Sequence, residues 1–263
     1  MGRNFKNIAR LIDSANKLTT PEQDFLADLK RSIELNEDKN RRKPSQTYKP
    51  SSMHCIRNMY YQVSGIEQDS SDKSYCLIGI CNSGTDIHVR IQTAVDKMKD
   101  NGIDCEYVDV AKFIKDRNLS DNIDIVEKSG METKLYHKYF NMSFLCDGII
   151  KYKGHYYILE IKTESSYKWL NRKGVDEDHY HQGISYSIVF NIPEVLFLYV
   201  NRDNLDMKAY MFTPTEEQKY DLIGLIETCD DYVKQNKVPP KPENLSKNVC
   251  SYCNYKSTCN KDN

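Results

Sequence analysis

The sequence predicts an α/β protein whose core is a mixed sheet covered by helices. Two short apolar runs, 141–151 and 155–163, have the length of strands and carry apolar residues on both faces, as central covered strands do. Residues 84–99, which precede them, place apolar side chains at helical spacing, and residues 176–190, which follow, are typical of a helix with acidic residues in its first turn. Helix, strands and helix in this order indicate an α/β core over about residues 75–235.

Residues 1–74 are expected to form an N-terminal helical segment and linker. Three helices and a polar, proline-bounded linker are predicted there, the helices at 5–18, 20–36 and 52–63 and the linker at 36–50. Thr20, Pro21 and Gln23 mark the start of the second helix with an N-cap, a first-turn proline and a capping-box glutamine.

Further elements of the core follow the two central strands. Strands are predicted at 194–200 and 206–212, and a long helix at 215–235 begins with a capping-box pair, Thr215 and Gln218. Between residues 105 and 136 the pattern indicates a short helix at 110–117 and an extended segment that ends at Leu135 and Tyr136. Residues 236–263, rich in proline and then in cysteine, form a third part, the C-terminal segment.

The composition indicates a soluble globular protein with a polar surface. Among 263 residues, 39% are hydrophobic and 29% are charged, and the net charge of −1 gives no indication of a nucleic-acid partner. No apolar run approaches the roughly 20 residues of a membrane span. The first residues lack the apolar core of a signal peptide, and Lys6 stands where a myristoylation motif has Ser or Thr. We therefore expect a cytoplasmic protein.

Asp147 and Glu160 are expected to face each other across a β-hairpin. With Lys153 and Gly154 as its two central turn residues, positions 147 and 160 are equidistant from the turn and directly opposite. Carboxylates placed in this way lie about 4.5–5.5 Å apart at Cβ and repel each other. A hard divalent cation with oxygen ligands would relieve that repulsion. A bulged turn, which Gly154 also permits, would shift the register by one residue.

Lys162 leaves the strand on the same face as Glu160, because the two are two residues apart. Phosphodiester hydrolysis needs a bound metal ion and a nearby positive charge. Asp147 and Glu160 could hold Mg²⁺ or Mn²⁺, and Lys162 would supply the amine beside them. His88 is a candidate further ligand, because imidazole suits Mn²⁺ better than Mg²⁺. The alternatives are an interior Glu160–Lys162 ion pair and an ordinary core or surface histidine.

Gln182 and Tyr186 lie four residues apart and therefore share one helix face. They are candidates to contact a substrate backbone by hydrogen bond and ring edge. The alternative is a helix that simply packs Tyr186 on the sheet.

The chain has nine cysteines, an odd number that argues against a disulfide framework in a cytoplasmic protein. Five of them lie in mixed apolar surroundings and are predicted to be small core residues: Cys76, Cys81, Cys105, Cys146 and Cys229. The polar tail carries Cys250, Cys253 and Cys259, three thiols that would leave a tetrahedral site one ligand short, with Cys55 as the obvious fourth. Spacing alone leaves zinc and an iron–sulfur cluster both open.

The two constellations together resemble the RecB-like exonucleases that carry an iron–sulfur cluster. These belong to the PD-(D/E)XK (restriction-endonuclease-like) superfamily, and the CRISPR-associated adaptation nuclease and its phage-encoded relatives are the most similar in appearance. The resemblance covers residues 48–259 in the family's order, through the stretches 48–61 and 84–92, Asp147, the run Glu160-Ile161-Lys162, Gln182 with Tyr186, and the three tail cysteines.

The resemblance implies a role for each matching residue. The implied metal ligands are His88, Asp147, Glu160 and the main-chain carbonyl of Ile161. Lys162 would be the catalytic lysine, beside the catalytic Asp147 and Glu160, and Gln182 with Tyr186 the DNA-contacting motif. The implied ligands of a 4Fe-4S cluster are Cys55, Cys250, Cys253 and Cys259. Two departures are Ile56, where the family commonly has proline, and the first 45 or so residues, which have no counterpart.

The expected fold is thus a mixed-sheet nuclease core flanked by helices, with an iron–sulfur lobe built from both termini. The expected activity is a metal-dependent DNA exonuclease acting mainly on single-stranded ends, in a bacterial or phage-infected host cell. The run Asn171-Arg172-Lys173, which carries two basic residues, is a candidate to meet phosphates. The alternative is a non-catalytic DNA-binding or adaptor protein of a recombination or spacer-acquisition complex, so recombination or CRISPR-adaptation proteins are conceivable partners.

Overall fold

A computed structural model describes most of the chain, and its described residues are 20–39, 45–69, 74–129, 131–243, 245, 247–251 and 253–262. The chain forms two compact units. The first comprises Met1–Arg42 with Asp72–Cys81, and the second comprises Lys43–Ser71 with Asn82–Asn263. The predicted helix at 5–18 lies outside the described residues. None of the described helices is long and apolar enough to cross a membrane.

In the first unit, helix α2 (Pro21–Lys39) accompanies the first turns of helix α4 (Tyr75–Asp96). The predicted capping-box glutamine is confirmed, because the side chain of Gln23 accepts a 3.0 Å hydrogen bond from the backbone N–H of Thr20. Glu34 on α2 accepts a 3.0 Å hydrogen bond from the backbone N–H of Tyr75, which fixes the start of α4 in this unit.

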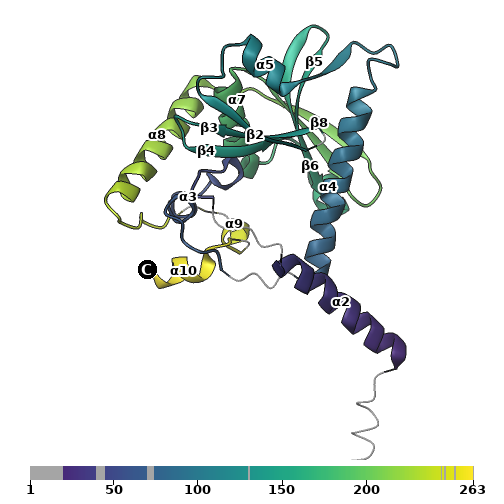
Figure 1. The fold of residues 1–263 in the computed structure, drawn as a ribbon, viewed down its shortest axis with the longest axis vertical. Helices are drawn as coiled ribbons and strands as arrows, with labels where there is room; N and C mark the ends of the chain where they lie inside the picture. Colours follow the sequence, from purple (N-terminus) through teal and green to yellow (C-terminus); the bar gives the residue numbers. More distant parts are fainter. Residues whose placement is uncertain are drawn as a thin grey trace, which may run out of the picture. The chain divides into compact units, whose positions relative to one another are not determined.

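The second unit is built on a five-stranded mixed sheet in the order β1-β5-β6-β7-β8 (Figure 1). Only the β6–β7 pair is parallel, and its crossover contains helices α6 (Ser166–Asn171) and α7 (Tyr180–Phe190). The strands are β1 (Cys105–Val108), β5 (Gly148–Tyr152), β6 (His155–Glu164), β7 (Val195–Asn201) and β8 (Met207–Phe212). The α/β class with a mixed sheet is as predicted.

A smaller antiparallel sheet, β2-β3-β4, corrects part of the prediction. The expected single strand over 141–151 is two strands in two different sheets, because the chain leaves β4 after Cys146 and enters β5 at Gly148. Asp147 is the residue at this change of sheet. The region 105–136 holds more than expected: β1, helix α5 (Val110–Asp116), β2 (Ile123–Ser129) and β3 (Glu132–His137), with β4 at Met142–Cys146.

Both faces of the five-stranded sheet are covered, as the apolar pattern predicts. On one face Ile87 of α4 packs with Leu159 and Ile161 of β6. On the other face, residues of α7 pack with alternate residues of the same strands, such as Ile158 and Phe197. Glycine at 183 permits this close approach, since a Cβ there would lie 2.9 Å from the Phe212 ring.

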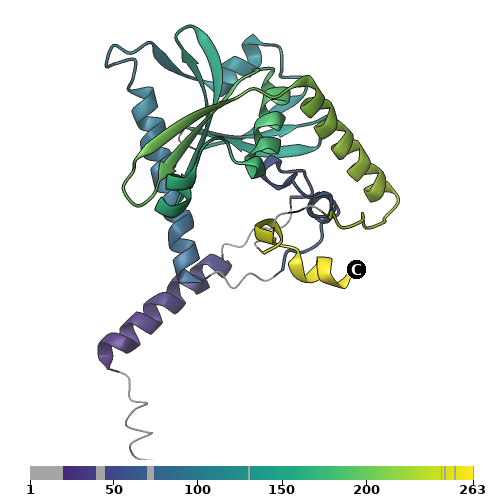
Figure 2. The ribbon, with the colours of Figure 1, turned by 180° about the vertical axis from the view of Figure 1, so that it is seen from behind.

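Segments from the two ends of the second unit lie side by side (Figures 1 and 2). Helix α3 (Ile56–Val63) neighbours the long helix α8 (Glu216–Lys234) and the short tail helices α9 (Lys247–Ser251) and α10 (Lys256–Lys261). Arg57 of α3 donates to the backbone carbonyls of Pro239, at 2.8 Å, and Cys259, at 3.1 Å. The capping box of α8 is confirmed at Thr215 and Gln218.

The cysteines predicted to be core residues divide into two groups. Cys105, Cys146 and Cys229 are buried as predicted. Cys76 and Cys81 are exposed, and this part of the prediction is wrong. Both lie on the first turns of α4, which extends further toward the N-terminus than the predicted helix at 84–99.

Candidate functional site

The turn of the β5–β6 hairpin sets the register on which the candidate site depends. Lys153 and Gly154 both have positive φ, 48° and 82°, as the predicted two-residue turn requires. Tyr152 pairs with His155, and the ladder continues to Gly148 opposite Leu159. Asp147 therefore falls opposite Glu160 at the next position. The register prediction is confirmed, and the alternative of a bulged turn is wrong.

Asp147 is held on several sides where the chain changes sheet. Its Oδ2 accepts a 2.8 Å hydrogen bond from the backbone N–H of Ile161, and its Oδ1 lies 3.2 Å from Nδ1 of His88. Its backbone carbonyl accepts hydrogen bonds from Nε2 of Gln92, at 2.8 Å, and from the hydroxyl of Tyr107. The carboxylate is thus fixed between α4 and β6.

Ile161 offers its main chain to the same space. In a strand, the N–H and C=O of one residue point to the same side. Strand β5 begins only at Gly148, so position 161 has no partner on that strand. Its N–H reaches Asp147 instead, and its carbonyl faces the same side as that N–H.

Glu160 is buried and incompletely satisfied. It is 3% exposed, and its Oε1 accepts 2.7 Å hydrogen bonds from Nζ of Lys162 and from Nε2 of Gln182. Its Oε2 is also buried and has no hydrogen-bond partner among the described residues. Burial raises the pKa of this carboxyl to about 7, with the charge of Asp147 adding to the rise and Lys162 opposing it. A buried carboxylate oxygen without a partner is costly unless a cation binds it.

His88 faces Asp147 from helix α4. Burial acts to lower the pKa of His88, but the hydrogen bond to Asp147 and the charge of that carboxylate outweigh it, so the pKa is raised. A divalent cation would compete with this proton, because a ligating imidazole must be neutral.

Lys162, Gln182 and Tyr186 form one chain of hydrogen bonds. Lys162 Nζ donates to Oε1 of Gln182 at 2.7 Å, and Nε2 of Gln182 donates to the Tyr186 hydroxyl at 2.9 Å. That hydroxyl donates in turn to the carbonyl of Leu145 at 2.8 Å. Tyr186 is only 2% exposed. In this structure it therefore positions Gln182, while Lys162, with a side chain that is 21% exposed, is the member nearest to solvent.

Glu132 is a site residue that the sequence analysis missed. In the described part of the chain, one group of three side chains has ligand atoms all within 4.8 Å of one another: His88, Glu132 and Asp147. Glu160 does not belong to this group. Burial, followed by the charge of Asp147, raises the pKa of Glu132. The missing signal was the β3–β4 hairpin, in which position 132 is as far from the turn as Asp147.

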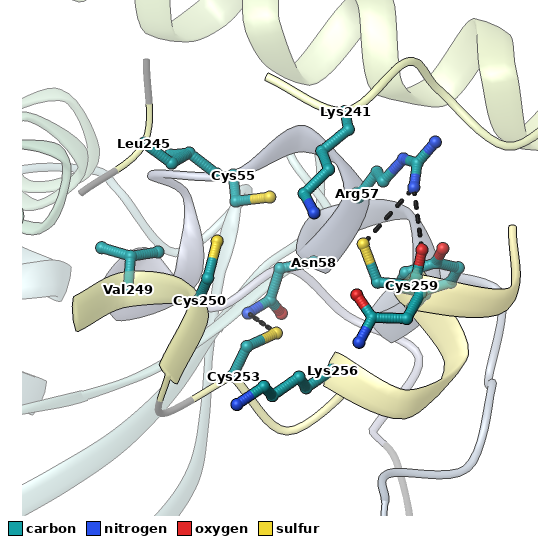
Figure 3. Close-up of a pocket in the computed structure, with 12 residues that line it drawn as sticks. Cys55, Arg57, Asn58, Lys241, Leu245, Val249, Cys250, Cys253, Lys256 and Cys259 are labelled. Atoms are coloured by element: carbon teal, nitrogen blue, oxygen red, sulfur yellow. Dashed lines mark hydrogen bonds between the residues drawn. The ribbon is translucent and has the colours of Figure 1, made fainter. Parts of the chain in front are cut away.

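The four cysteines singled out in the sequence line one pocket (Figure 3). Cys55 is the N-cap of α3, and Cys250, Cys253 and Cys259 come from the tail. Asn58 donates to the sulfur of Cys253 at 3.9 Å, and Arg57 donates to that of Cys259 at 3.4 Å. The sulfur atoms are directed into a common space, with Lys241 and Lys256 also in its lining.

The chemistry of this pocket suits a cationic centre with thiolate ligands. Burial raises the pKa of the Cys55 and Cys253 thiols, so a bound centre would have to displace their protons. Four thiolates around one zinc ion stand about 3.8 Å apart, because each Zn–S bond is about 2.3 Å long in a tetrahedral site. No three thiols of the described residues meet even a spacing of 4.8 Å.

A groove of about 610 Å³ leads from Lys162 and Gln182 to the cysteine-bearing tail. His54, Lys168 and His179 lie along it, and Asn58 and Cys253 line both the groove and the cysteine pocket. One wall of the groove is therefore built from residues that also surround the four thiols.

The side chain of Arg172 is not available to bind a phosphate. Its side chain is 6% exposed and pairs with Glu164 at 2.8 Å and with Asp176 at 3.0 Å. The expectation that it meets a phosphate is corrected, because its donors are already used inside the protein.

Comparisons with known proteins give only distant likenesses. No family model matches the chain, and no curated protein matches it. The crystal structure of SSO0001 is similar with 14% identity and a TM-score of 0.48, over 91% of this chain and 98% of that one. The crystal structure of a "Putative exonuclease" from Eubacterium rectale is similar with 12% identity and a TM-score of 0.35, over 79% of this chain and 89% of that one. Likenesses this distant carry no argument about activity.

Proposed function

We propose that this chain is a metal-dependent deoxyribonuclease of the PD-(D/E)XK type, an exonuclease acting mainly on single-stranded DNA ends. The observation that carries the proposal is the buried, unpartnered Oε2 of Glu160 next to Asp147, with Lys162 on the same carboxylate. If Glu160 served only as the partner of Lys162 in an interior ion pair, both of its carboxylate oxygens would have hydrogen-bond partners. Here one oxygen is left for a further ligand.

The donors suit a hard divalent cation. Asp147, Glu160 and the carbonyl of Ile161 supply oxygen, which Mg²⁺ and Mn²⁺ prefer, and His88 supplies an imidazole that suits Mn²⁺. A bound ion would lower the pKa of a water molecule and polarise the scissile phosphate.

The protein's own groups would then orient the reaction. Lys162 donates two of its three N–H groups to Glu160 and Gln182, which fixes the ammonium in place. The third is left to orient the attacking water and to offset charge on the phosphoryl oxygens. Gln182 is hydrogen-bonded to Tyr186, and it holds the side chains of Lys162 and Glu160 in place.

The cysteine pocket is proposed to hold a 4Fe-4S cluster with Cys55, Cys250, Cys253 and Cys259 as ligands. The support is that the four thiols line one pocket, as the ligands of one shared centre would. Arg57 and Asn58 donate hydrogen bonds to two of the sulfurs, as groups around an iron–sulfur cluster do. Zinc is the alternative. The cluster would join α3 to the tail, so its binding would also stabilise the fold.

A groove of about 610 Å³ beside Lys162 supports the binding of a nucleic-acid backbone next to the site. Two lysines, Lys162 and Lys168, line it; Lys168 is 52% exposed, and its ammonium lies 2.7 Å from Asp176. Lysine side chains along a groove attract a phosphodiester backbone.

Digestion of end-labelled single-stranded and double-stranded DNA with Mg²⁺, Mn²⁺ or chelator tests the proposal. We expect loss of the single strand with either ion, no loss in chelator, and at least a hundredfold slower cleavage by Lys162→Ala. Lys168→Ala is a matched control, because it removes a lysine from the same groove and should weaken binding instead. Unchanged cleavage by Lys162→Ala would overturn the enzyme assignment. DNA binding without any cleavage would favour an adaptor of a recombination or spacer-acquisition complex.

A further inference from the structure

Three carboxylates form a row across two hairpins that meet at Asp147. In the β3–β4 hairpin, Thr133 pairs with Cys146, so Glu132 falls opposite Asp147 at the next position. In the β5–β6 hairpin, Glu160 falls opposite Asp147 by the same reasoning. Asp147 is thus the register partner of Glu132 on one side and of Glu160 on the other, because the chain changes sheets at this residue.

The carboxylate of Glu132 points toward the side chains of His88 and Asp147. This carboxylate lies within 4.8 Å of ligand atoms of both His88 and Asp147. The side chain is half-buried and has no hydrogen-bond or ion-pair partner among the described residues. A solvated strand residue or a partner of a lysine would not place its carboxylate beside another carboxylate, because like charges opposite each other are destabilising.

The backbone around Glu132 is tied to that of Asp147. The hydroxyl of Tyr107 lies within hydrogen-bonding distance of the carbonyl of Met131, at 3.3 Å, and of the carbonyl of Asp147. Gly148 leaves room for this tyrosine, since a Cβ at position 148 would collide with its ring. The approach of Glu132 to Asp147 is therefore built into the fold.

We propose that Glu132 is a further ligand of the divalent cation, completing with His88 and Asp147 a position of one nitrogen and two carboxylates. The inference rests on the proposed function, which uses Asp147, Glu160 and Ile161 for the same ion. A second observation, separate from the approach of Glu132 to His88 and Asp147, also points to a cation: Oε2 of Glu160 is buried and has no partner among the described residues. Mn²⁺ is the better probe, because it accepts both imidazole and carboxylate.

Titration of the full-length protein with Mn²⁺ in the absence of DNA, followed by the electron paramagnetic resonance of the unbound ion, tests the inference. Glu132→Gln keeps the shape of the side chain and removes its charge. We expect it to weaken Mn²⁺ binding by about 10–100-fold, the range seen when a supporting group of a metal site is lost. Glu127→Gln on the neighbouring strand is the matched control, because Glu127 is exposed and lies outside the ligand group. The control should bind Mn²⁺ like the unchanged protein.

Thermal unfolding separates a ligand from a structural residue. Without metal, Glu132→Gln should unfold at the same temperature or higher, because one of three adjacent negative charges is gone. With Mn²⁺, its rise in unfolding temperature should be smaller than that of the unchanged protein. A lower unfolding temperature without metal, together with unaltered Mn²⁺ affinity, would overturn the inference.

The two proposals fail in different ways. If the unchanged protein binds no Mn²⁺, the proposed function and this inference are both refuted. If it binds Mn²⁺ and cleaves DNA while Glu132→Gln binds Mn²⁺ equally well, only the role of Glu132 is refuted.

Discussion

Replacement of Arg172 by alanine should cost more stability than any loss of a surface charge. The guanidinium donates to both oxygens of Glu164, with distances of 2.8, 3.0 and 2.8 Å. It also donates to Asp176 and to the carbonyl of Gly174, both at 3.0 Å, and lies 4.0 Å from the centroid of the Tyr199 ring. The side chains of Arg172 and Glu164 are 6% and 5% exposed, so this is an interior ion pair.

The magnitude follows from what the substitution leaves behind. Arg172→Ala would strand the carboxylate of Glu164 in the interior without its cation. Breaking a buried pair in this way costs about 3–5 kcal/mol, whereas an exposed pair is worth about 0–1 kcal/mol. We therefore expect the free energy of unfolding, measured by urea denaturation with circular dichroism, to fall by about 3–5 kcal/mol.

Two further variants make the measurement decisive. Lys173→Ala is the control, because Lys173 is the exposed neighbour and should leave stability within about 0.5 kcal/mol of the unchanged protein. Arg172→Ala combined with Glu164→Gln should recover part of the loss, because the stranded charge is gone. A loss below about 1 kcal/mol for Arg172→Ala would show that the pair behaves as a solvated one and would refute the reasoning.

Three other outcomes are expected. Because burial raises the pKa of Glu160 to about 7, a proton competes with the cation below that pH. Mn²⁺ affinity, measured by calorimetry, should fall about tenfold from pH 8 to pH 6, with protonation of His88 adding to the fall, and Glu160→Gln should remove the Glu160 part. Cys253→Ser should abolish any broad visible absorption of the anaerobically purified protein. It should also weaken the binding of fluorescent single-stranded DNA, because Cys253 lines both the cysteine pocket and the groove. If the unchanged protein is colourless and contains zinc, the cluster is refuted. Gly183→Ala should lower the free energy of unfolding by about 1–3 kcal/mol, because its Cβ would lie 2.9 Å from Phe212; unchanged stability would show that the ring moves aside at no cost.

The local part of the site could be predicted because it depends on one short hairpin. The turn at Lys153 and Gly154 needs positive φ at both positions, and this alone sets Asp147 opposite Glu160. The helix that carries Gln182 was likewise predicted, from the acidic residues at 176–178, although α7 itself begins at Tyr180. These features follow from interactions between residues close in sequence, which a single sequence contains.

The three-stranded sheet could not be predicted in the same way. The pattern does not separate β2 from β3, because β2 exposes the apolar side chains of Ile125 and Val126 and a bulge between Ile125 and Glu127 interrupts the alternation. Without β3, nothing in the sequence pattern singles out Glu132. The exposure of Cys76 and Cys81 was missed for a related reason, because an apolar neighbourhood in sequence does not show which side of a helix is covered.

By itself, the sequence determined the α/β class, the turn and register of the central hairpin, and the set of four cysteines that line one pocket. Only the tertiary structure decided that the chain changes sheets at Asp147, that Glu132 and His88 meet there, and that Tyr186 and Arg172 turn inward. The physical reason is distance along the chain. Turns and helix periods are set by neighbouring residues, whereas the contacts among Glu132, Asp147 and His88 depend on how two sheets and a helix pack together.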